Sequence, residues 1–267
     1  MSRRLRLDAE LVRRGLARSR DQAADLIAAG RVAVAGQLAA KPASHVAVDA
    51  AITVEQASEG PDYVSRGGHK LAGALAVFAT HGLVVAGKRC LDAGASTGGF
   101  TDVLLRAGAA QVVAVDVGYG QLAWSLRRDE RVTVLDRVNV RNLTPEQVAP
   151  PPDLVVADLS FISLTVVLPA LAACAAESAD FLLMVKPQFE VGKDKAGSGV
   201  VRDPELRAAA VGKVASAAAG VGLGVAGITA SPLPGPSGNV EYFLWLRRGA
   251  EPLDDAALRQ AIVAGPQ

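Results

Sequence analysis

The chain has 267 residues, of which 50% are hydrophobic and 21% charged, and its formal net charge is +1. This high apolar content and low net charge exclude disorder over most of the length and allow one good core plus a smaller satellite domain. The two cysteines, Cys90 and Cys174, exclude a disulfide scaffold. Since neither belongs to a Cys-x-x-Cys pattern, we expect no metal knuckle and a reducing environment.

No segment is predicted to be a secretory signal or a membrane span. Residues 1–14 lack the apolar core of about 7–15 residues that a signal peptide needs. The uncharged run 214–240 is rich in Ala and Gly, and Pro232, Pro234 and Pro236 interrupt it. A span needs about 20 strongly apolar residues, so we interpret this run as a helix end, a strand and a loop. We therefore expect a cytoplasmic protein with no membrane partner.

The first predicted elements form a small α+β unit, residues 1–60. Asp8 is expected to cap a short helix, and a capping box of Ser19 and Gln22 is expected to start a second helix that ends at Gly30. Two short strands are predicted after these helices. They cover residues 31–36 and 51–56.

Positive charge is concentrated in this unit. Residues 1–41 carry nine basic and four acidic residues, a net charge of +5 in a chain whose total is +1. Arg is the preferred bidentate donor to phosphate, so we expect the unit to bind the backbone of folded RNA. A solvated basic face is the alternative. The candidate RNA-binding residues are Arg4, Arg6, Arg18, Arg20 and Arg66.

After a linker at residues 61–64, the pattern changes to alternating strands and helices over residues 65–267. The strands are continuously apolar, which predicts a parallel, doubly wound sheet buried on both faces. No helix separates the last two strands, so we expect them to form an antiparallel hairpin. The predicted strands are 89–94, 111–118, 132–136, 153–160, 181–187, 223–233 and 240–248, and the predicted helices are 98–106, 121–128, 163–176 and 204–220.

A cofactor site is predicted where the first two strands of this sheet end. The segment DAGASTGGF, residues 92–100, combines glycines for close backbone approach with a following helix whose first N–H groups are free. Asp116 ends the second strand and can accept both hydroxyls of a ribose. The glycine spacing differs from G-x-G-x-x-G, so S-adenosylmethionine fits this pattern better than NAD.

The third strand offers two candidates for an adenine contact, Asp136 and Asn139. Either residue could equally form a turn, and the sequence leaves the choice open. The full set of candidate cofactor residues is Asp92, Gly94, Ser96, Gly98, Phe100, Asp116, Asp136, Asn139 and Asp158.

Four ionisable side chains are predicted to converge near this cofactor site. Lys186 ends an apolar strand in a chain with seven lysines, and Asp158 ends a neighbouring strand. Glu241 begins the last strand, and Lys70 precedes the first. Open α/β sheets bind ligands at the carboxyl ends of their strands, so these groups can hold a hydroxyl and remove its proton. An ordinary buried ion-pair network is the alternative.

Six segments together resemble the TlyA family of ribosomal-RNA 2′-O-methyltransferases, which has also been labelled hemolysin A. The resemblance covers nearly the whole chain. It implies a Rossmann-like class I S-adenosylmethionine-dependent methyltransferase domain of the FtsJ-like type, joined to an RNA-binding module like that of ribosomal protein S-four. The segments are SRGGHKL (65–71), LDAGASTGGFTDVLL (91–105), DVGYGQL (116–122), ADLSFISL (157–164), VKPQFEVGK (185–193) and PLPGPSGNVEYFLWL (232–246).

The resemblance also implies a catalytic tetrad and a reaction. The tetrad of the family falls on Lys70, Asp158, Lys186 and Glu241, with Lys186 accepting or orienting the hydroxyl proton. The reaction is methyl transfer from S-adenosylmethionine to a cytidine 2′-hydroxyl in 23S rRNA, and in some members also in 16S rRNA. This methylation confers sensitivity to capreomycin and viomycin. The expected partners are ribosomal RNA and the ribosomal subunits, with no obligate protein partner.

Three other readings compete with this one. An NAD-dependent oxidoreductase would share the architecture, but the glycine spacing and the final hairpin argue against it. An RNA-binding ribosome-assembly factor without catalysis would not need the intact tetrad. A membrane-lytic protein would need a span, a secretion signal or an amphipathic repeat, and we find none in the sequence.

Overall fold

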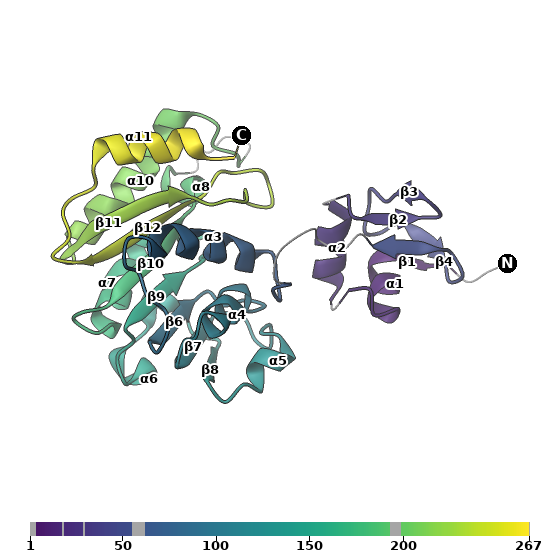
Figure 1. Cartoon of the computed structure of the whole chain (residues 1–267), viewed down its shortest axis with the longest axis horizontal. Helices are drawn as coiled ribbons and strands as arrows, with labels where there is room; N and C mark the ends of the chain where they lie inside the picture. Colours follow the sequence, from purple (N-terminus) through teal and green to yellow (C-terminus); the bar gives the residue numbers. More distant parts are fainter. Residues whose placement is uncertain (1–3, 18, 29, 55–61, 193–198, 267) are drawn as a thin grey trace. The chain divides into compact units, whose positions relative to one another are not determined.

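The computed structural model describes residues 4–17, 19–28, 30–54, 62–192 and 199–266 (Figure 1). The chain divides into two compact units, Met1–Asp62 and Tyr63–Gln267. Of the predicted linker at 61–64, residue 61 lies outside the described residues. Val64 already belongs to the second unit, where its backbone N–H donates to Asp102 Oδ2 at 2.9 Å.

The first unit packs two helices against two small sheets. Its core contains Leu7, Leu11 and Ile27. One sheet pairs β1 with β4, and the other has the order β3-β2-β5; all of these pairs are antiparallel. The elements are β1 (Arg4–Arg6), α1 (Leu7–Arg13), α2 (Arg20–Ala28), β2 (Val32–Val34), β3 (Gln37–Leu38), β4 (His45–Ala47) and β5 (Ile52–Val54).

The helix boundaries of this unit partly match the prediction. Ser19 Oγ accepts from the backbone N–H of Gln22 at 3.1 Å, as a cap does, and Gly30 follows α2 with φ +67. The capping role predicted for Asp8 is wrong, because α1 starts at Leu7 directly from the extended residue Arg6. The predicted strand end at residues 55–56 lies outside the described residues.

The second unit contains a seven-stranded sheet of order β11-β12-β10-β9-β6-β7-β8 (Figure 1). The predicted fold is confirmed: β6 to β10 are parallel, and β12 lies antiparallel between β10 and β11. The strands are β6 (Arg89–Ala93), β7 (Gln111–Asp116), β8 (Val132–Asp136), β9 (Leu154–Ala157), β10 (Asp180–Val185), β11 (Leu223–Ala230) and β12 (Tyr242–Arg248).

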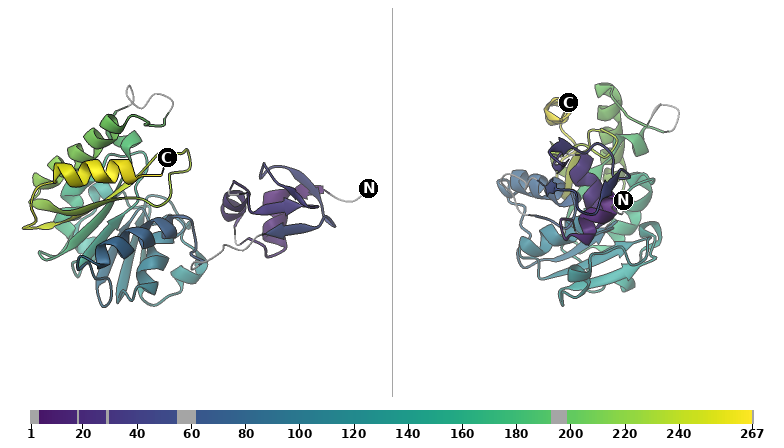
Figure 2. Two further views of the ribbon diagram at one scale, coloured as in Figure 1. Left: turned by 45° about the horizontal axis from the view of Figure 1, so that its top comes forward. Right: turned by 90° about the vertical axis from the view of Figure 1, so that its right-hand side faces the viewer.

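Helices cover both faces of this sheet (Figure 2). One core cluster joins the sheet to α3 and α4, and the other joins it to α7, α10 and α11. Both faces are therefore buried, as the apolar strands predicted. The helices are α3 (Gly67–Ala79), α4 (Gly99–Arg106), α5 (Trp124–Arg127), η1 (Val140–Asn142), α6 (Pro145–Val148), α7 (Leu164–Cys174), α8 (Pro187–Glu190), α10 (Pro204–Ala219) and α11 (Asp255–Ala264).

The sheet unit differs from the prediction in several places. Helices α3, α6, α8 and α11 and the turn η1 were not predicted, and the helix expected at 121–128 covers only the four residues of α5. Asp158 and Glu241, expected at the ends of strands, lie just outside them, because β9 ends at Ala157 and β12 starts at Tyr242. The strand expected to include Lys186 ends at Val185, because Pro187 starts a helical turn that Lys186 caps. The run 214–240 does form a helix end, a strand and a loop. Across the part of the chain that the structure describes, no helix is long and apolar enough to cross a membrane.

Candidate active site

A cavity of about 830 Å³ lies where the parallel strands β6, β7, β8 and β9 end. The loops after these four strands supply most of its wall, and the first turns of α7 supply the rest. This is the edge at which open α/β sheets bind ligands. The lining residues used below are Gly94, Ser96, Asp116, Asn139, Asp158, Ser160, Phe161 and Ser163.

The glycine loop after β6 requires two of its glycines for steric reasons. Gly94 has φ +88, and a Cβ there would lie 2.6 Å from the carbonyl oxygen of Asp158. Gly98 has φ +101 and caps α4, and a Cβ there would lie 2.3 Å from Leu126. Gly94 therefore lets the backbone form the cavity wall, whereas Gly98 is needed for packing and does not line the cavity.

Asp116 holds two backbone segments next to the cavity in place. Its Oδ2 accepts from the N–H of Ser96 at 2.8 Å, and its Oδ1 accepts from the N–H of Gly118 at 2.6 Å. Ser96 itself has φ +47, a conformation that few non-glycine residues adopt. Since each carboxylate oxygen has two acceptor sites, Asp116 can hold this loop and still accept hydroxyl groups in the cavity.

The two adenine candidates occupy different environments. Asp136 forms an ion pair with Arg127 and accepts from the N–H of Gly120 at 3.3 Å, and it does not line the cavity. Asn139 lines the cavity while its Oδ1 accepts from the N–H of Arg141 at 3.0 Å and caps η1. The tertiary structure therefore favours Asn139 over Asp136.

Two further cofactor candidates, Asp92 and Phe100, lie behind the cavity wall. Asp92 is fully buried, and its Oδ2 accepts from Thr101 Oγ1 at 2.6 Å. Its Oδ1 has no hydrogen-bond partner among the described residues, and burial raises the pKa of this carboxyl to about 7. Phe100 stacks on Phe243 in the core. Both side chains support the loop from behind.

The four predicted catalytic side chains form two ion pairs. Lys186 Nζ lies 2.6 Å from Asp158 Oδ1, and Lys70 Nζ lies 2.6 Å from Glu241 Oε2. A Cβ on Gly67 would lie 3.8 Å from Asp158 Oδ2, so the first turn of α3, which carries Lys70, is next to the first pair. The structure therefore brings the tetrad together.

The two pairs differ in their access to solvent. The side chains of Lys70 and Glu241 are 7% and 1% exposed, whereas those of Lys186 and Asp158 are 11% and 24% exposed. Asp158 also lines the cavity. The pair of Lys186 and Asp158 is therefore the one that a substrate in the cavity can reach.

The structure describes four of the five predicted RNA-binding arginines. Arg6 and Arg20 both bind Asp8, at 2.8 and 2.9 Å, and these bonds lower the pKa of the Asp8 carboxyl well below its usual range. Arg4 is exposed on β1, and Arg66 Nη2 donates to the carbonyl oxygen of Pro234 at 3.2 Å. Arg18 lies outside the described residues.

Ser160 and Phe161 are among the residues of the cavity wall that sequence reasoning missed. Ser160 Oγ accepts from Lys186 Nζ at 3.0 Å. Phe161 is 92% exposed with φ +64, and its ring centroid is 5.2 Å from that of Phe189. No periodicity indicates either role, because both depend on the loop conformation after β9.

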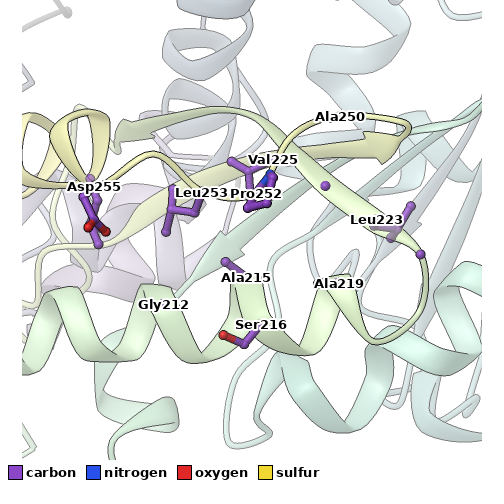
Figure 3. Close-up of a pocket in the computed structure, with 13 residues that line it drawn as sticks. Gly212, Ala215, Ser216, Ala219, Leu223, Val225, Ala250, Pro252, Leu253 and Asp255 are labelled. Carbon is purple, nitrogen blue, oxygen red and sulfur yellow. The ribbon is translucent and has the colours of Figure 1, made fainter.

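A second hollow, of about 460 Å³, lies between α10, β11 and the segment that leads to α11 (Figure 3). Gly, Ala, Leu and Val residues form most of its wall, with Ser216 on α10 and Asp255 on α11. It contains none of the predicted site residues.

Comparisons with known proteins agree with this fold. The FtsJ-like methyltransferase family model matches residues 63–248, and the S4 domain model matches residues 5–52. A putative S-adenosylmethionine-dependent methyltransferase from Listeria monocytogenes has the same fold, with a TM-score of 0.50 and 14% identity over 67% of this chain and 99% of that chain. The fold and the site thus define a Rossmann-like methyltransferase.

More similar proteins narrow the class. The chain is 62% identical to the 16S/23S rRNA (cytidine-2′-O)-methyltransferase TlyA of Mycobacterium tuberculosis, over 100% of both chains. A solved structure described as a putative hemolysin from Streptococcus thermophilus has a TM-score of 0.78 and 36% identity, over 98% of this chain and 96% of that chain. The chain therefore belongs to the FtsJ-like methyltransferases, in the TlyA family that also carries an S4 domain.

Proposed function

We propose that this enzyme methylates the ribose 2′-hydroxyl of cytidine in ribosomal RNA, in the 23S molecule and also in the 16S molecule. The full-length similarity to a protein named for this reaction supports the proposal. The observation that carries it is the ion pair of Lys186 and Asp158 at the cavity. A lysine side chain in its neutral amine form can remove a proton from a hydroxyl, and the neighbouring carboxylate holds that side chain in place.

S-adenosylmethionine is the cofactor that the cavity residues fit. Gly94 lines the cavity and lets its loop pack against the carbonyl of Asp158, and the Asp116 carboxylate suits ribose hydroxyls. Asn139 is the polar side chain beyond the third strand that lines the cavity and suits the adenine. When bound, this cofactor supplies an electrophilic methyl group on a cationic sulfur. The carboxylates of Asp116 and Asp158 would favour that cation electrostatically.

The remaining chemistry belongs to the side chains of the chain itself. For this role Lys186 reacts as the neutral amine, after its ammonium has released one proton to solvent. When the ribose oxygen bonds to the methyl carbon, this amine would take the hydroxyl proton, and the electrons of the broken carbon–sulfur bond would remain on the sulfur that leaves. Asp158 holds Lys186 at the cavity, and the buried pair of Lys70 and Glu241 supports the wall behind it. Alignment of the hydroxyl supplies much of the rate, because proximity and orientation are worth several kcal/mol.

The target cytidine base must also leave the RNA helix before the enzyme can reach its ribose. Enzymes that modify a nucleotide within folded RNA expose it and stack its base on aromatic side chains. Phe161 is fully accessible at the cavity and is braced by Phe189. We assign Phe161 this stacking role, and the arginines of the S4 domain the role of holding the RNA backbone. Since its substrate is ribosomal RNA, the enzyme acts in the cytoplasm.

The test is methylation of ribosomal RNA by the purified enzyme with labelled S-adenosylmethionine. We expect label in 23S and 16S RNA, with reverse-transcription stops that map it to cytidine riboses. Cells without the enzyme should lack these stops and lose sensitivity to capreomycin. Label on a base, or none on either RNA, would contradict the proposal. Calorimetry with NAD as the control ligand should show no binding.

A further inference from the structure

Ser160 makes a contact that none of the tetrad residues can replace. It follows Asp158 by two residues, lies in the cavity wall, and is exposed. Its Oγ accepts a hydrogen bond from Lys186 Nζ at 3.0 Å. Since Lys186 follows β10 and Ser160 follows β9, this bond joins the ends of two neighbouring parallel strands.

Lys186 has two oxygen neighbours among the described residues. Asp158 Oδ1 lies 2.6 Å from Nζ, the distance of a close ion pair. Ser160 Oγ accepts an N–H of the same Nζ at 3.0 Å. Together the two oxygens occupy two of the three tetrahedral positions around Nζ, so the Ser160 contact fixes the rotation that the ion pair alone leaves open.

Direction matters for an amine that takes a proton. Nitrogen in a lysine side chain has one bond to carbon and three other tetrahedral positions, and rotation about the Cε–Nζ bond exchanges them. A hydroxyl can transfer its proton only to the position that holds the lone pair. Fixing one N–H on a neighbouring acceptor therefore determines where the lone pair points.

We propose that Ser160 is a positioning residue, which binds one N–H of Lys186 and so directs the proton-accepting position of the amine toward the ribose hydroxyl. This inference rests on the proposed function, in which Lys186 removes the hydroxyl proton. Ser160 need not touch the RNA for this role. It acts on the rate of methyl transfer and not on the binding of either substrate.

The experiment compares Ser160→Ala, Ser160→Thr and a control, Ser216→Ala. Ser216 is an exposed serine that lines the other hollow (Figure 3). In single-turnover and steady-state methylation of rRNA, Ser160→Ala should lower kcat roughly 10- to 100-fold, since small misplacements of reacting groups cost that much. KM for RNA and for S-adenosylmethionine should stay within about twofold. Ser160→Thr keeps the hydroxyl and should recover most of kcat, and Ser216→Ala should match the wild type.

Three results would overturn the inference while leaving the proposed function in place. They are an unchanged kcat in Ser160→Ala, a raised KM for RNA with unchanged kcat, and a Ser160→Thr variant as slow as Ser160→Ala. A crystal structure of each variant tests the proposal independently of activity, because it shows the position of Lys186. Lys186 Nζ should occupy one position in the wild type and several in Ser160→Ala, and a single shared position would contradict the proposal. An inactive wild type would instead refute the proposed function.

Discussion

At the scale of single residues, burial divides the four ionisable groups of the site into two kinds. Lys70 and Glu241 are shielded from water and partner each other. Lys186 and Asp158 are equally close to each other but more exposed, and Asp158 lines the cavity. Removing one member of a buried pair leaves an uncompensated charge, whereas water can solvate the survivor of an open pair. Stability and activity should therefore respond to different lysines.

Replacing Lys186 should abolish methyl transfer without unfolding the protein. We expect Lys186→Ala to lower the single-turnover rate by about 10²–10⁴, the usual contribution of a general base. Lys186→Arg should fail as well, because a guanidinium stays protonated. In contrast, Lys70→Ala should lower the free energy of unfolding by about 3–5 kcal/mol, because Glu241 would remain buried and unpaired. Thermal denaturation and rapid-quench methylation measure both effects. A stable Lys186→Ala enzyme with the wild-type rate would refute the mechanism.

The cofactor assignment predicts a contrast among three polar residues. Asp116→Ala should weaken S-adenosylmethionine binding at least tenfold, because it removes the ribose acceptor and frees the backbone at Ser96 and Gly118. Asn139→Ala should weaken it less, and Asp136→Ala should change the affinity by no more than about threefold. Titration calorimetry measures all three. Equal losses at Asp136 and Asn139 would contradict the assignment of the adenine contact, and RNA binding should be unaffected in each variant.

Asp92 should make the free energy of unfolding depend on pH. The pKa of its carboxyl is raised to about 7, so between about pH 4 and 7 the folded state keeps a proton that the unfolded state has lost. The free energy of unfolding therefore falls as pH rises through this window, by on the order of 4 kcal/mol for a shift of this size. The variant Asp92→Asn has no carboxyl group at this position, so its free energy of unfolding lacks this pH dependence. Urea denaturation at several pH values should show that the free energy of unfolding of the variant rises relative to that of the wild type as the pH increases to about 7. A difference between the two proteins that does not change with pH would exclude the effect.

At the scale of elements, the carboxyl-end loops are held by contacts between helices that follow different strands. Glu190 at the end of α8 is 3% exposed, and its carboxylate accepts from the N–H of Leu164 at 2.8 Å and from the hydroxyl of Ser163. Ser163 caps α7 and lines the cavity. The turn that follows Lys186 therefore holds the helix that completes the cavity wall.

Glu190→Ala should destabilise the sheet unit by about 2 kcal/mol, because the buried N–H of Leu164 loses its acceptor and the half-buried hydroxyl of Ser163 loses one of its partners. Glu190→Gln retains an acceptor oxygen and should cost less than half as much. Urea denaturation followed by tryptophan fluorescence measures this difference, since Trp245 lies in the core of this unit. If both variants lost the same stability, the charge of Glu190 and not its hydrogen bonds would be the stabilising feature.

At the scale of the whole molecule, positive charge and chemistry lie in different units. The first unit carries the excess of arginine, and the sheet unit carries the cavity and the tetrad. Arg6 and Arg20 share Asp8, which holds their guanidinium groups near each other while about half of each side chain stays exposed. Because Asp8 already holds both guanidinium groups in place, they can contact phosphate oxygens without losing further conformational freedom.

Replacing Arg4, Arg6 and Arg20 together with Ala should weaken RNA binding and reduce its salt dependence. Each lost phosphate contact lowers the log–log salt slope by roughly 0.7–0.9, so the slope should decrease by roughly 2. The control is Arg131→Ala in the sheet unit, which removes one exposed arginine outside the first unit; Arg131 pairs with Asp129, and its loss should leave the slope unchanged. Filter binding of an rRNA fragment at several salt concentrations measures both. An unchanged slope in the triple variant would show that these arginines are only a solvated face.

The sequence by itself determined the sheet of this protein and the positions of its chemical groups along the chain. Continuous apolar strands, the missing helix before the last strand, and acids at strand ends are local patterns, and the seven strands and the antiparallel hairpin agree with them. Helix α3 was not predicted from the sequence, because the two glycines of its first turn, Gly67 and Gly68, have a low helix propensity. That turn packs against Ser65, Tyr63 and Gly99, so tertiary contacts override the local propensity.

Only the tertiary structure decided which of these groups work together. The pairing of Lys186 with Asp158 and of Lys70 with Glu241, the position of Asn139 at the cavity and of Asp136 away from it, and the positions of Ser160 and Phe161 all depend on loop conformations. Side-chain periodicity reports which face of an element is buried, and it carries no information on how a loop turns after a strand ends. Such turns are set by contacts between distant segments, as at Gly94, whose missing Cβ leaves room for the carbonyl of Asp158.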